Sequence, residues 1–351
     1  MKIFILGPLQ TKDYFGGVAT FDEGLAHGFL SQGHAVFVFT DQNNVLPTQD
    51  LTVVRLNKKR LVQSIDIEKP DIIIAQLAYA KYLVGVNTSA TKVYYLHAFF
   101  KQSYYGKIRS ELAVIYQKAL IKHFDYVISN SHFTDVVNRD FFGIKSDAVV
   151  HVGVDDKFYN LVANHSYVKK QKGKIFFASR LVPAKGGERL LRAINCLNKN
   201  NVEYTLYIAG DGIEKNKLEN MAQKNQWKVN FLGRLDSKQM IEEYLSSEIF
   251  VSLDPTEPMG ITFLEALICN CKIVCPVTGG QVELLSKYDN SVSFVDCYDS
   301  EDIARGISYQ LKEGKLPELT DAEKEQYTYH RVAENLIDVL NKLAKKNYGI
   351  C

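Results

Sequence analysis

The chain has 351 residues, of which 46% are hydrophobic and 23% charged, and its 42 basic and 40 acidic side chains give a formal net charge of +2. This length suits two ordinary domains, and the composition excludes a disordered chain, a fibrous protein and a broadly basic nucleic-acid binder. No apolar run approaches the roughly 20 residues needed to cross a bilayer. The apolar run at residues 3–6 is too short for the core of a signal peptide. We therefore expect a soluble protein of the cytoplasm.

Short apolar segments recur along the chain, and each is followed by an amphipathic stretch. Strands are predicted at residues 2–6, 35–40, 71–77, 92–96 and 126–129 of a first domain, and at 174–178, 204–209, 249–253 and 272–275 of a second. Between the first two strands, Phe21, Leu25 and Phe29 share one helix face and Asp22 lies off it. This alternation predicts two doubly wound α/β domains with parallel sheets, and a ligand held in the cleft between them.

The predicted domain boundaries follow from polar segments. A polar stretch at residues 155–173 predicts the connection, so that residues 1–165 form the N-terminal domain and 166–330 the C-terminal domain. Residues 331–351 form a last amphipathic helix with Val332, Leu336 and Leu343 on one face.

The cysteines do not suggest a metal or disulfide framework. All six lie in the second half of the chain, which contains no Cys-x-x-Cys pair and one histidine, His330. Because the spacing and the partners do not suit zinc, and because a chain of this size has no need of disulfide bonds, small buried thiols are predicted.

Common nucleotide-binding motifs are missing. No Gly-x-Gly-x-x-Gly follows the first strand, and the nearest match, Gly210-Asp-Gly212, has Lys215 where the third glycine belongs. The P-loop pattern is also missing, because none of the Gly-Lys pairs precedes Ser or Thr. A dehydrogenase and a P-loop nucleotidase are therefore disfavoured.

The first candidate motif is the glycine pair that opens the first helix. Gly16 and Gly17 follow Tyr14 and Phe15 and precede the helical pattern. Adjacent glycines let a ligand approach the backbone closely, and the N-terminus of a helix favours an anion. A tight turn between strand and helix would explain the same residues.

The second candidate motif lies just after the first strand of the second domain. Arg180 and Lys185 are five residues apart and precede Gly186-Gly187 at a predicted helix start. An arginine fork and a lysine point charge together suit a diphosphate. Two solvated loop cations are the alternative.

The third candidate motif contains two glutamates. Glu265 is the only charged residue between Pro258 and Cys271, in an otherwise apolar helical run. A lone buried carboxylate requires a hydrogen-bonding partner, and ribose hydroxyls or protein groups would both serve. Gly260 predicts the helix start, so Glu257 falls in the preceding loop.

In this order, the motifs resemble family 4 of the retaining glycosyltransferases, which have the GT-B fold. The resemblance covers roughly residues 1–285. It rests on the following residues: Gly16-Gly17, Gly33-His34, Asn130-Ser131, Gly153-Val154-Asp155, Ser179-Arg180, Lys185-Gly186, Gly210-Asp211-Gly212, Phe231-Leu232-Gly233, Glu257, Glu265 and Gly279-Gly280. It implies two Rossmann-like domains that face a central cleft, and it allows the C-terminal helix to cross back to the first domain.

The resemblance also implies a donor site for a nucleotide-activated hexose. Its members would be Gly16, Gly17, Arg180, Lys185, Gly233, Arg234, Glu257, Gly260, Ile261 and Glu265. Within this set, Arg180 and Lys185 would bind the diphosphate, Glu265 the ribose and Glu257 the hexose. The backbone near Gly233 would border the base, and familiarity with the family favours UDP.

The catalytic residues implied by the resemblance are His97, Arg180, Lys185 and Glu257. His97 ends a predicted strand and matches the family's active-site histidine; a structural histidine at a strand end is the alternative. Because no carboxylate nucleophile is evident, retention suggests a front-face displacement that relies on positioning and charge stabilisation. The chain contains no Asp-x-Asp, so we expect no metal and no cofactor.

The region expected to meet the acceptor is basic and aromatic. Between Arg55 and Lys122 there are 12 basic and 4 acidic residues, and nine aromatic residues lie between positions 79 and 116, including Phe99, Phe100, Tyr104 and Tyr105. Such a surface suits an anionic membrane or a lipid-diphosphate acceptor. A solvated basic face is the alternative, and the donor motifs argue against nucleic acid.

The function predicted is therefore transfer of a hexose, with retention, from a nucleotide sugar to a glycan or lipid-linked acceptor in surface polysaccharide or glycoconjugate synthesis. A sugar-nucleotide epimerase and a catalytically silent GT-B partner subunit remain alternatives. A periplasmic sugar-binding protein would share the two-domain cleft but would need an export signal.

Overall fold

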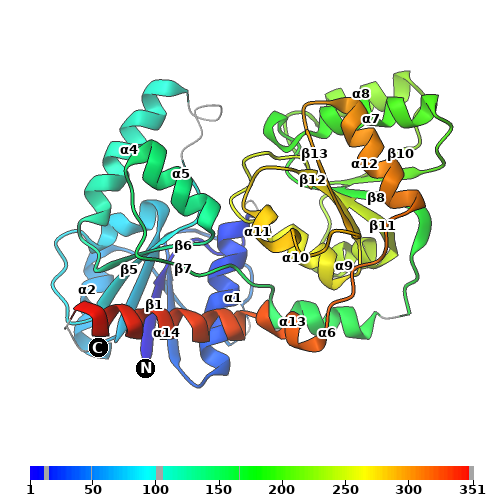
Figure 1. Cartoon of the computed structure of the whole chain (residues 1–351). Helices are drawn as coiled ribbons and strands as arrows, with labels where there is room; N and C mark the ends of the chain where they lie inside the picture. The colour runs from blue at the N-terminus through cyan, green and yellow to red at the C-terminus, as the bar shows by residue number, and fades with distance from the viewer. Residues whose placement is uncertain (12–15, 49, 100–105, 166, 348–351) are drawn as a thin grey trace. The chain divides into compact units, whose positions relative to one another are not determined.

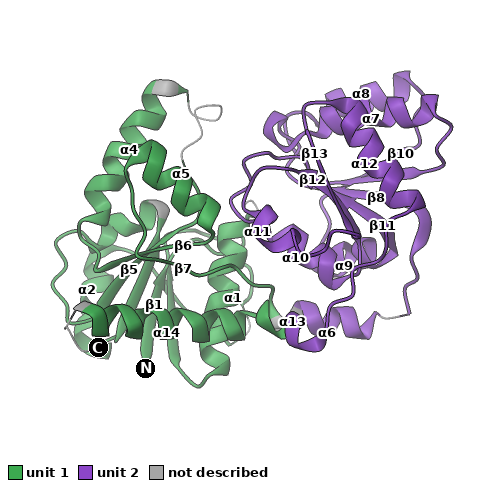
Figure 2. Cartoon of the chain, in the orientation of Figure 1, with its two compact units in different colours: residues 1–156, 325–351 green, residues 157–324 purple. Residues whose placement is uncertain are grey.

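The computed structural model describes residues 1–11, 16–48, 50–99, 106–165 and 167–347, and it divides the chain into two compact units (Figures 1 and 2). Unit 1 comprises residues 1–156 and 325–351, and unit 2 comprises residues 157–324. The predicted boundaries, after residues 165 and 330, each lie a few residues further along the chain. Tyr14, Phe15, Phe100, Tyr104 and Tyr105 lie outside the described residues.

Unit 1 is built on a parallel sheet with the order β3-β2-β1-β4-β5-β6-β7. Its strands are β1 (Lys2–Leu6), β2 (Ala35–Thr40), β3 (Thr52–Arg55), β4 (Ile72–Gln76), β5 (Thr91–Leu96), β6 (Tyr126–Ser129) and β7 (Ala148–Val149). The helices are α1 (Gly17–Ser31), α2 (Lys58–Glu68), the 3-10 helix η1 (Leu77–Leu83), α4 (Lys107–Ile121), α5 (His132–Phe142) and α14 (Tyr329–Asn347). The order of the strands reverses between β1 and β4.

Unit 2 contains a second parallel sheet, with the order β10-β9-β8-β11-β12-β13. Its strands are β8 (Gln171–Ala178), β9 (Thr205–Ala209), β10 (Val229–Gly233), β11 (Ser247–Val251), β12 (Lys272–Pro276) and β13 (Val292–Val295). The helices are η2 (Pro183–Lys185), α7 (Gly187–Lys199), α8 (Lys215–Lys224), α9 (Ser237–Ser246), α10 (Ile261–Ile268), α11 (Gln281–Leu285) and α12 (Ser300–Lys312). The order reverses between β8 and β11. The prediction of two doubly wound α/β domains is confirmed.

Helices cover both faces of each sheet. In unit 2, Ile175 and Phe177 of β8 pack with α7, α8 and α12, whereas Phe176 points to the other face, where its ring lies 5.2 Å from that of Tyr244 in α9. This alternation follows from the two-residue period of a strand, and burial on both faces explains why the central strands are continuous apolar runs. In Figure 1, α7, α8 and α12 lie on the face of the sheet opposite to α9 and α10.

The last helix of the chain, α14, packs against α1 within unit 1. Phe21 of α1 contacts the ring of Tyr329, with a centroid separation of 5.8 Å, and a Cβ on Gly24 would lie 2.1 Å from the same ring. The chain therefore starts and ends in one unit. The helical pattern predicts that Asp22 lies outside the apolar face of α1, and this is wrong, because Asp22 is fully buried.

The strands that were not predicted are those at the sheet edges. All four, β3, β7, β10 and β13, are edge strands, and among them only β13 has any buried residue. An edge strand buries less of its surface, so it lacks the continuous apolar run of a central strand. The predicted connection at residues 155–173 is also partly wrong, because it contains α6 (Asp156–Asn164) and the first residues of β8. The helix α13 (Asp321–Gln326) leads back to unit 1.

Two further expectations concern cysteines and membranes. Four of the five described cysteines are buried and all five are free, which confirms the predicted thiols: Cys196, Cys269, Cys271, Cys275 and Cys297. Within the described ranges, we find no helix that combines the length and the apolar character required to cross a membrane.

Candidate active site

The unit 2 candidates gather where the order of the second sheet reverses. The loop after β8 carries Arg180 and Lys185, and the loop after the neighbouring β11 carries Glu257. In doubly wound sheets, ligands bind at the carboxyl ends of the strands on either side of such a reversal. Two loops that are about 70 residues apart in sequence are therefore brought together by strand order.

Lys185 is the centre of a buried ion cluster. Its Nζ lies 3.1 Å from Oδ2 of Asp254 and also contacts the carboxylate of Glu257. Burial alone would lower the pKa of Lys185, but the charges of Glu257 and Asp254 outweigh it and hold the pKa above its ordinary value. Lys185 therefore stays positively charged, between two carboxylates.

Asp254 is a member of this cluster that the sequence analysis missed. Its side chain is 1% exposed, and Oδ1 accepts hydrogen bonds from the backbone N–H and the hydroxyl of Thr256 at 3.0 and 2.7 Å. The available signal was its position directly after the predicted strand at 249–253, where carboxyl-end residues face a ligand.

Arg189 in α7 holds the two loops together and was also missed. Its Nη2 donates to the carbonyl oxygen of Leu253 at 2.7 Å and to that of Ala184 at 3.1 Å. The guanidinium lies 5.1 Å from the ring of Tyr298. One arginine thus fixes the residue before Lys185 to the residue before Asp254, and nothing in the local sequence indicates this.

The loop that carries Glu257 requires glycine at two positions. Gly260 caps α10 with a φ of 82°, and a Cβ there would lie 2.5 Å from the ring of Phe263 and 3.1 Å from Cγ of Glu257. Gly280 donates its N–H to the carbonyl oxygen of Glu257 at 2.8 Å, and a Cβ on it would lie 1.8 Å from the carbonyl oxygen of Pro258. Glycine at these positions therefore fixes the path of the chain around Glu257. Ile261 begins α10, as the sequence predicts.

Glu265 has a protein partner. The hydroxyl of Tyr244 in α9 donates to Oε2 of Glu265 at 2.9 Å. Burial raises the pKa of Glu265 to about 7, although the Tyr244 hydrogen bond works in the opposite direction. The carboxyl group therefore changes charge near neutral pH. Tyr244 is a further residue that the sequence analysis missed.

The other unit 2 candidates lie at exposed strand ends. Arg180 is exposed, and among the residues that the structure describes its guanidinium has no ion-pair partner. Gly233 ends β10 with a φ of 68°, and its carbonyl oxygen accepts from the N–H of Gly210 at 2.7 Å. Arg234 lies 3.6 Å from the carboxylate of Asp211.

In unit 1, the glycine pair lies at the start of α1. Gly16 is the N-cap residue and Gly17 is the first residue of the helix. A Cβ on Gly17 would meet nothing within 4 Å, so packing within the described residues does not require glycine there. Open space in front of free helical N–H groups is compatible with an anion.

His97 follows β5 and is 6% exposed. Its Nε2 contacts Oε1 of Gln76, which ends the neighbouring strand β4, and its carbonyl oxygen accepts from Nδ2 of Asn130 at 2.9 Å. Burial lowers the pKa of His97 to about 3, so the imidazole is neutral at physiological pH. The ring packs against both Phe21 and Tyr95, whose ring centroids lie 4.5 and 4.8 Å away.

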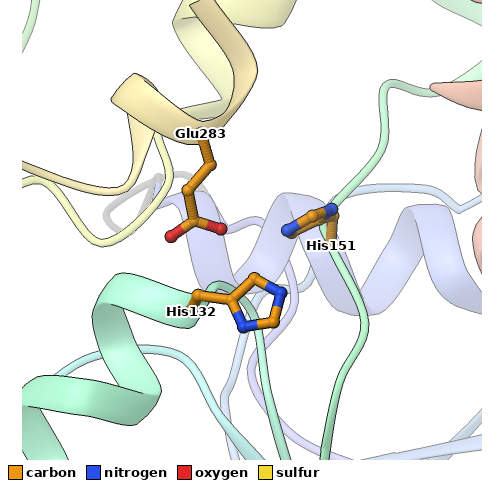
Figure 3. Close-up of side chains that lie close together, drawn as sticks. All are labelled: His132, His151 and Glu283. Atoms are coloured by element: carbon orange, nitrogen blue, oxygen red, sulfur yellow. The ribbon is translucent and has the colours of Figure 1, made fainter. Parts of the chain in front are cut away.

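Two further histidines of unit 1 lie close together. The rings of His132 and His151, both exposed, have a centroid separation of 6.1 Å (Figure 3). Glu283, also labelled in Figure 3, belongs to α11 of unit 2. Taken by itself, unit 1 offers two imidazoles here, fewer than the three protein ligands of a catalytic zinc site.

In the comparison with known proteins, each half of the chain matches a glycosyltransferase family. Residues 15–158 match the family described as "Glycosyltransferase Family 4", and residues 163–327 match "Glycosyl transferases group 1". An uncharacterized glycosyltransferase from Methanocaldococcus jannaschii is 29% identical over 190 residues, which cover 52% of this chain and 48% of that protein. The chain thus spans about half the length of this relative.

A match over nearly the whole chain is found with alpha-monoglucosyldiacylglycerol synthase from Streptococcus pneumoniae. It is 23% identical over 93% of this chain and 82% of that protein. Among solved structures, Anabaena HepE in complex with UDP and glucose has a TM-score of 0.69 at 18% identity and covers 99% of this chain and all of the other. This likeness shows that the fold is shared.

Proposed function

We propose, from the premise that this chain belongs to family 4 of the GT-B glycosyltransferases, that it transfers a hexose from UDP-hexose to a glycan or lipid-linked acceptor with retention of configuration. The observation that carries the proposal is the Lys185–Asp254–Glu257 cluster at the reversal of the second sheet. A lysine held between carboxylates at a ligand-binding strand end suits a phosphate that develops negative charge.

The donor site extends from this cluster. Arg180, which is exposed, and Lys185 supply positive charge for the diphosphate, and Glu265 supplies an acceptor for the ribose hydroxyls. Gly233 and Arg234 border the base, and Gly260 and Ile261 provide backbone N–H groups at the start of α10 for the hexose. Gly16 and Gly17, at the start of α1, are proposed to bind phosphate through backbone N–H groups. UDP is favoured because Anabaena HepE, which shares the fold, was solved with UDP and glucose.

The proposed reaction is a front-face displacement. The bond between the anomeric carbon and the leaving phosphate oxygen breaks, the acceptor oxygen bonds to that carbon on the same face, and the acceptor proton passes to the phosphate. Because Glu257 contacts Lys185, binding of the donor would move the lysine toward phosphate and free Glu257 for hydroxyls of the hexose. Positive charge from Arg180 and Lys185 takes the part that a metal plays elsewhere, so we propose a metal-independent reaction that needs no cofactor.

A nucleotide titration tests this donor assignment. We expect calorimetry in excess EDTA to detect binding of UDP, and weaker or no binding of GDP, ADP and dTDP. Arg180→Ala should weaken UDP binding at least tenfold, since charge-assisted hydrogen bonds contribute about 1.5–3 kcal/mol. If UDP does not bind without metal, or if Arg180→Ala binds UDP as tightly as the wild type, the assignment of the donor site is wrong. A different preferred nucleotide would change only the donor.

An activity assay with the wild-type protein distinguishes the alternative functions. Incubation with UDP-glucose and a lipid or glycan acceptor yields a glycosylated product and UDP if the chain is a transferase, whereas an epimerase yields the epimeric nucleotide sugar. Binding of UDP without either product would favour a silent partner subunit. The fully formed ion cluster around Lys185 argues against that alternative, because such a subunit does not require it.

We also propose that the basic and aromatic region between Arg55 and Lys122 binds the anionic inner face of the cytoplasmic membrane. The helix α4 leaves Ile108, Leu112, Ile115 and Tyr116 between 51% and 74% exposed, at positions that share one face. Arg109 and Lys118 are exposed on the same helix, as are Lys58, Lys59 and Arg60 at the start of α2. An apolar stripe beside cations is typical of helices that lie at an anionic lipid surface.

Substitutions on α4 test membrane binding. The double variant Leu112→Glu/Ile115→Glu should weaken flotation with anionic vesicles at least tenfold, because each exposed apolar side chain contributes about 1.5 kcal/mol or more when it is buried. Ile213→Glu in unit 2, where the side chain is 85% exposed, is the matched control and should leave flotation unchanged. The proposal would be contradicted if flotation stayed unchanged in the α4 variant. It would also be contradicted if flotation stayed unchanged after charge reversal at Lys58, Lys59 and Arg60.

A further inference from the structure

A buried carboxyl group lies where the order of the first sheet reverses. Asp22 of α1 is fully buried, and neither of its oxygens has a hydrogen-bond partner among the residues that the structure describes. Burial raises the pKa of this carboxyl group well above its usual range. An unpartnered buried polar group is costly, about 1–3 kcal/mol, and in native proteins it requires an explanation.

The amide of Gln76 lies close by and has an unused donor. Its Nε2 is also buried without a partner in the described structure. Asp22 and Gln76 converge on Gly7, which follows β1: a Cβ on that glycine would lie 1.9 Å from Oδ2 of Asp22 and 2.8 Å from Nε2 of Gln76. Both atoms therefore lie against the same glycine, with the amide nitrogen close to the carboxyl oxygen.

The other end of the same amide contacts His97. Oε1 of Gln76 faces Nε2 of the imidazole, so the ring nitrogen that lies against the amide oxygen must carry the hydrogen. The lone pair of the neutral ring is then on Nδ1. The ring itself is held in place by Phe21, the residue before Asp22, and by Tyr95.

We propose that Asp22 is a positioning residue that acts on His97 through Gln76. By accepting from the amide nitrogen, the carboxyl group keeps the amide oxygen turned toward the imidazole, and this fixes the tautomer with hydrogen on Nε2. Without Asp22, the amide can turn over and donate to Nε2, which moves the hydrogen to Nδ1. The fixed tautomer leaves Nδ1 as an acceptor for a hydroxyl of the hexose or acceptor; this last role rests on the proposed function.

The chain order supports the same arrangement. Gly7, Gln76 and His97 lie at the carboxyl ends of β1, β4 and β5, three adjacent strands around the reversal in the first sheet. This edge is where ligands bind in doubly wound folds. In addition, α14 packs on α1 through Tyr329 and Phe21, so the helix that carries Asp22 is held on both sides.

The experiment reads the tautomer directly, by ¹⁵N NMR of histidine-labelled protein, with the His97 signals assigned from the His97→Gln variant. In the wild type we expect one neutral tautomer with hydrogen on Nε2. Asp22→Ala should convert these signals to a mixture of tautomers, and should lower kcat about tenfold with the KM for the donor within twofold, as for other losses of positioning. Asp22→Asn keeps an acceptor oxygen, so it should retain the wild-type signals and rate. Glu23→Ala, on the same helix, is the matched control.

Each outcome decides the proposal. Unchanged His97 signals in Asp22→Ala would overturn it, whatever the rate. If Asp22→Ala does not fold, Gln76→Leu carries the same test, and its failure to shift the signals would also overturn the proposal. When both fold, the double variant should be no worse than either single variant, because the two residues act in series. If the signals shift as expected but no transfer is found in any variant, the proposed function fails and the positioning role stands.

Discussion

Replacing Lys185 by methionine is expected to lower kcat by about 10²–10³-fold, which is the usual cost of removing a charge that stabilises the transition state. The Lys185 ammonium is held by Asp254 and Glu257 at the strand ends where the leaving phosphate is proposed to lie. The variant should also be less stable by about 3 kcal/mol, since Asp254 would remain as a buried charge without its cation. Transfer rates and chemical denaturation measure the two effects.

A double variant separates these effects. Lys185→Met/Asp254→Asn removes the stranded charge, so it should recover most of the lost stability while kcat stays low. Lys199→Met, at the exposed end of α7, is the control and should change neither quantity. A kcat within threefold of wild type in Lys185→Met would show that this lysine does not serve the leaving group.

Glu265→Gln is expected to make the protein more stable and its nucleotide binding weaker at pH 8. Burial raises the pKa of Glu265 from its ordinary value of 4.5 to about 7. The folded protein thus holds a proton that the unfolded chain releases, so the free energy of unfolding falls as pH rises from about 4.5 to about 7. At 1.36 kcal/mol for each pKa unit, the fall is roughly 3 kcal/mol. Glutamine keeps the Tyr244 hydrogen bond without this loss.

The effect on binding has the opposite sign. A hydrogen bond to a charged group contributes about 1.5–3 kcal/mol and one between neutral groups about 0.5–1.5 kcal/mol, so two ribose hydroxyls together favour a carboxylate over an amide by about 2 kcal/mol. UDP binding to the wild type should therefore strengthen as pH rises through 7, and Glu265→Gln should bind UDP at least tenfold more weakly at pH 8.

Ionisation of the phosphates also changes UDP affinity with pH. Because UDP and 2′-deoxy-UDP share this effect, it cancels in the difference between their affinities. The difference in affinity between the two ligands should depend on pH in the wild type and not in Glu265→Gln. Glu313→Gln, an exposed carboxylate at the end of α12, is the matched control. A pH-independent difference in the wild type would show that Glu265 does not hold the ribose.

Central elements of both sheets could be predicted from the sequence because their apolar runs reflect burial on two faces. Strand β1 was predicted with its bounds, and the predicted bounds of β4 and β12 differ from the structure by one residue at one or both ends. The four edge strands, β3, β7, β10 and β13, were not predicted, because a strand with one neighbour buries too little surface to give a continuous apolar run.

The candidate site shows the same division. Glycines and charged residues after strands point to ligand-binding loops, so Lys185, Glu257 and Gly260 could be selected from local patterns and their order along the chain. The position of Asp254 directly after a predicted strand was also a usable signal, although its pairing with Lys185 was not evident. Arg189 and Tyr244 could not be selected, since each acts through a partner elsewhere in the sequence, Leu253 and Glu265. Pairing at such distances is decided by strand order, which a local pattern does not encode.

Asp22 is the clearest example of a residue whose environment the sequence pattern does not predict. By helical period alone it belongs to the polar side of α1, and for a helix with one covered face that inference is correct. In the folded chain, α14 returns from the end of the sequence to cover α1, and Gly7 and Gln76 close over the carboxyl group. The two parallel α/β units and their ligand-binding loops can be inferred from the sequence, because they depend on local period and burial. Which polar groups are buried and paired follows from the tertiary fold, because it depends on contacts between segments that are between 21 and 299 residues apart.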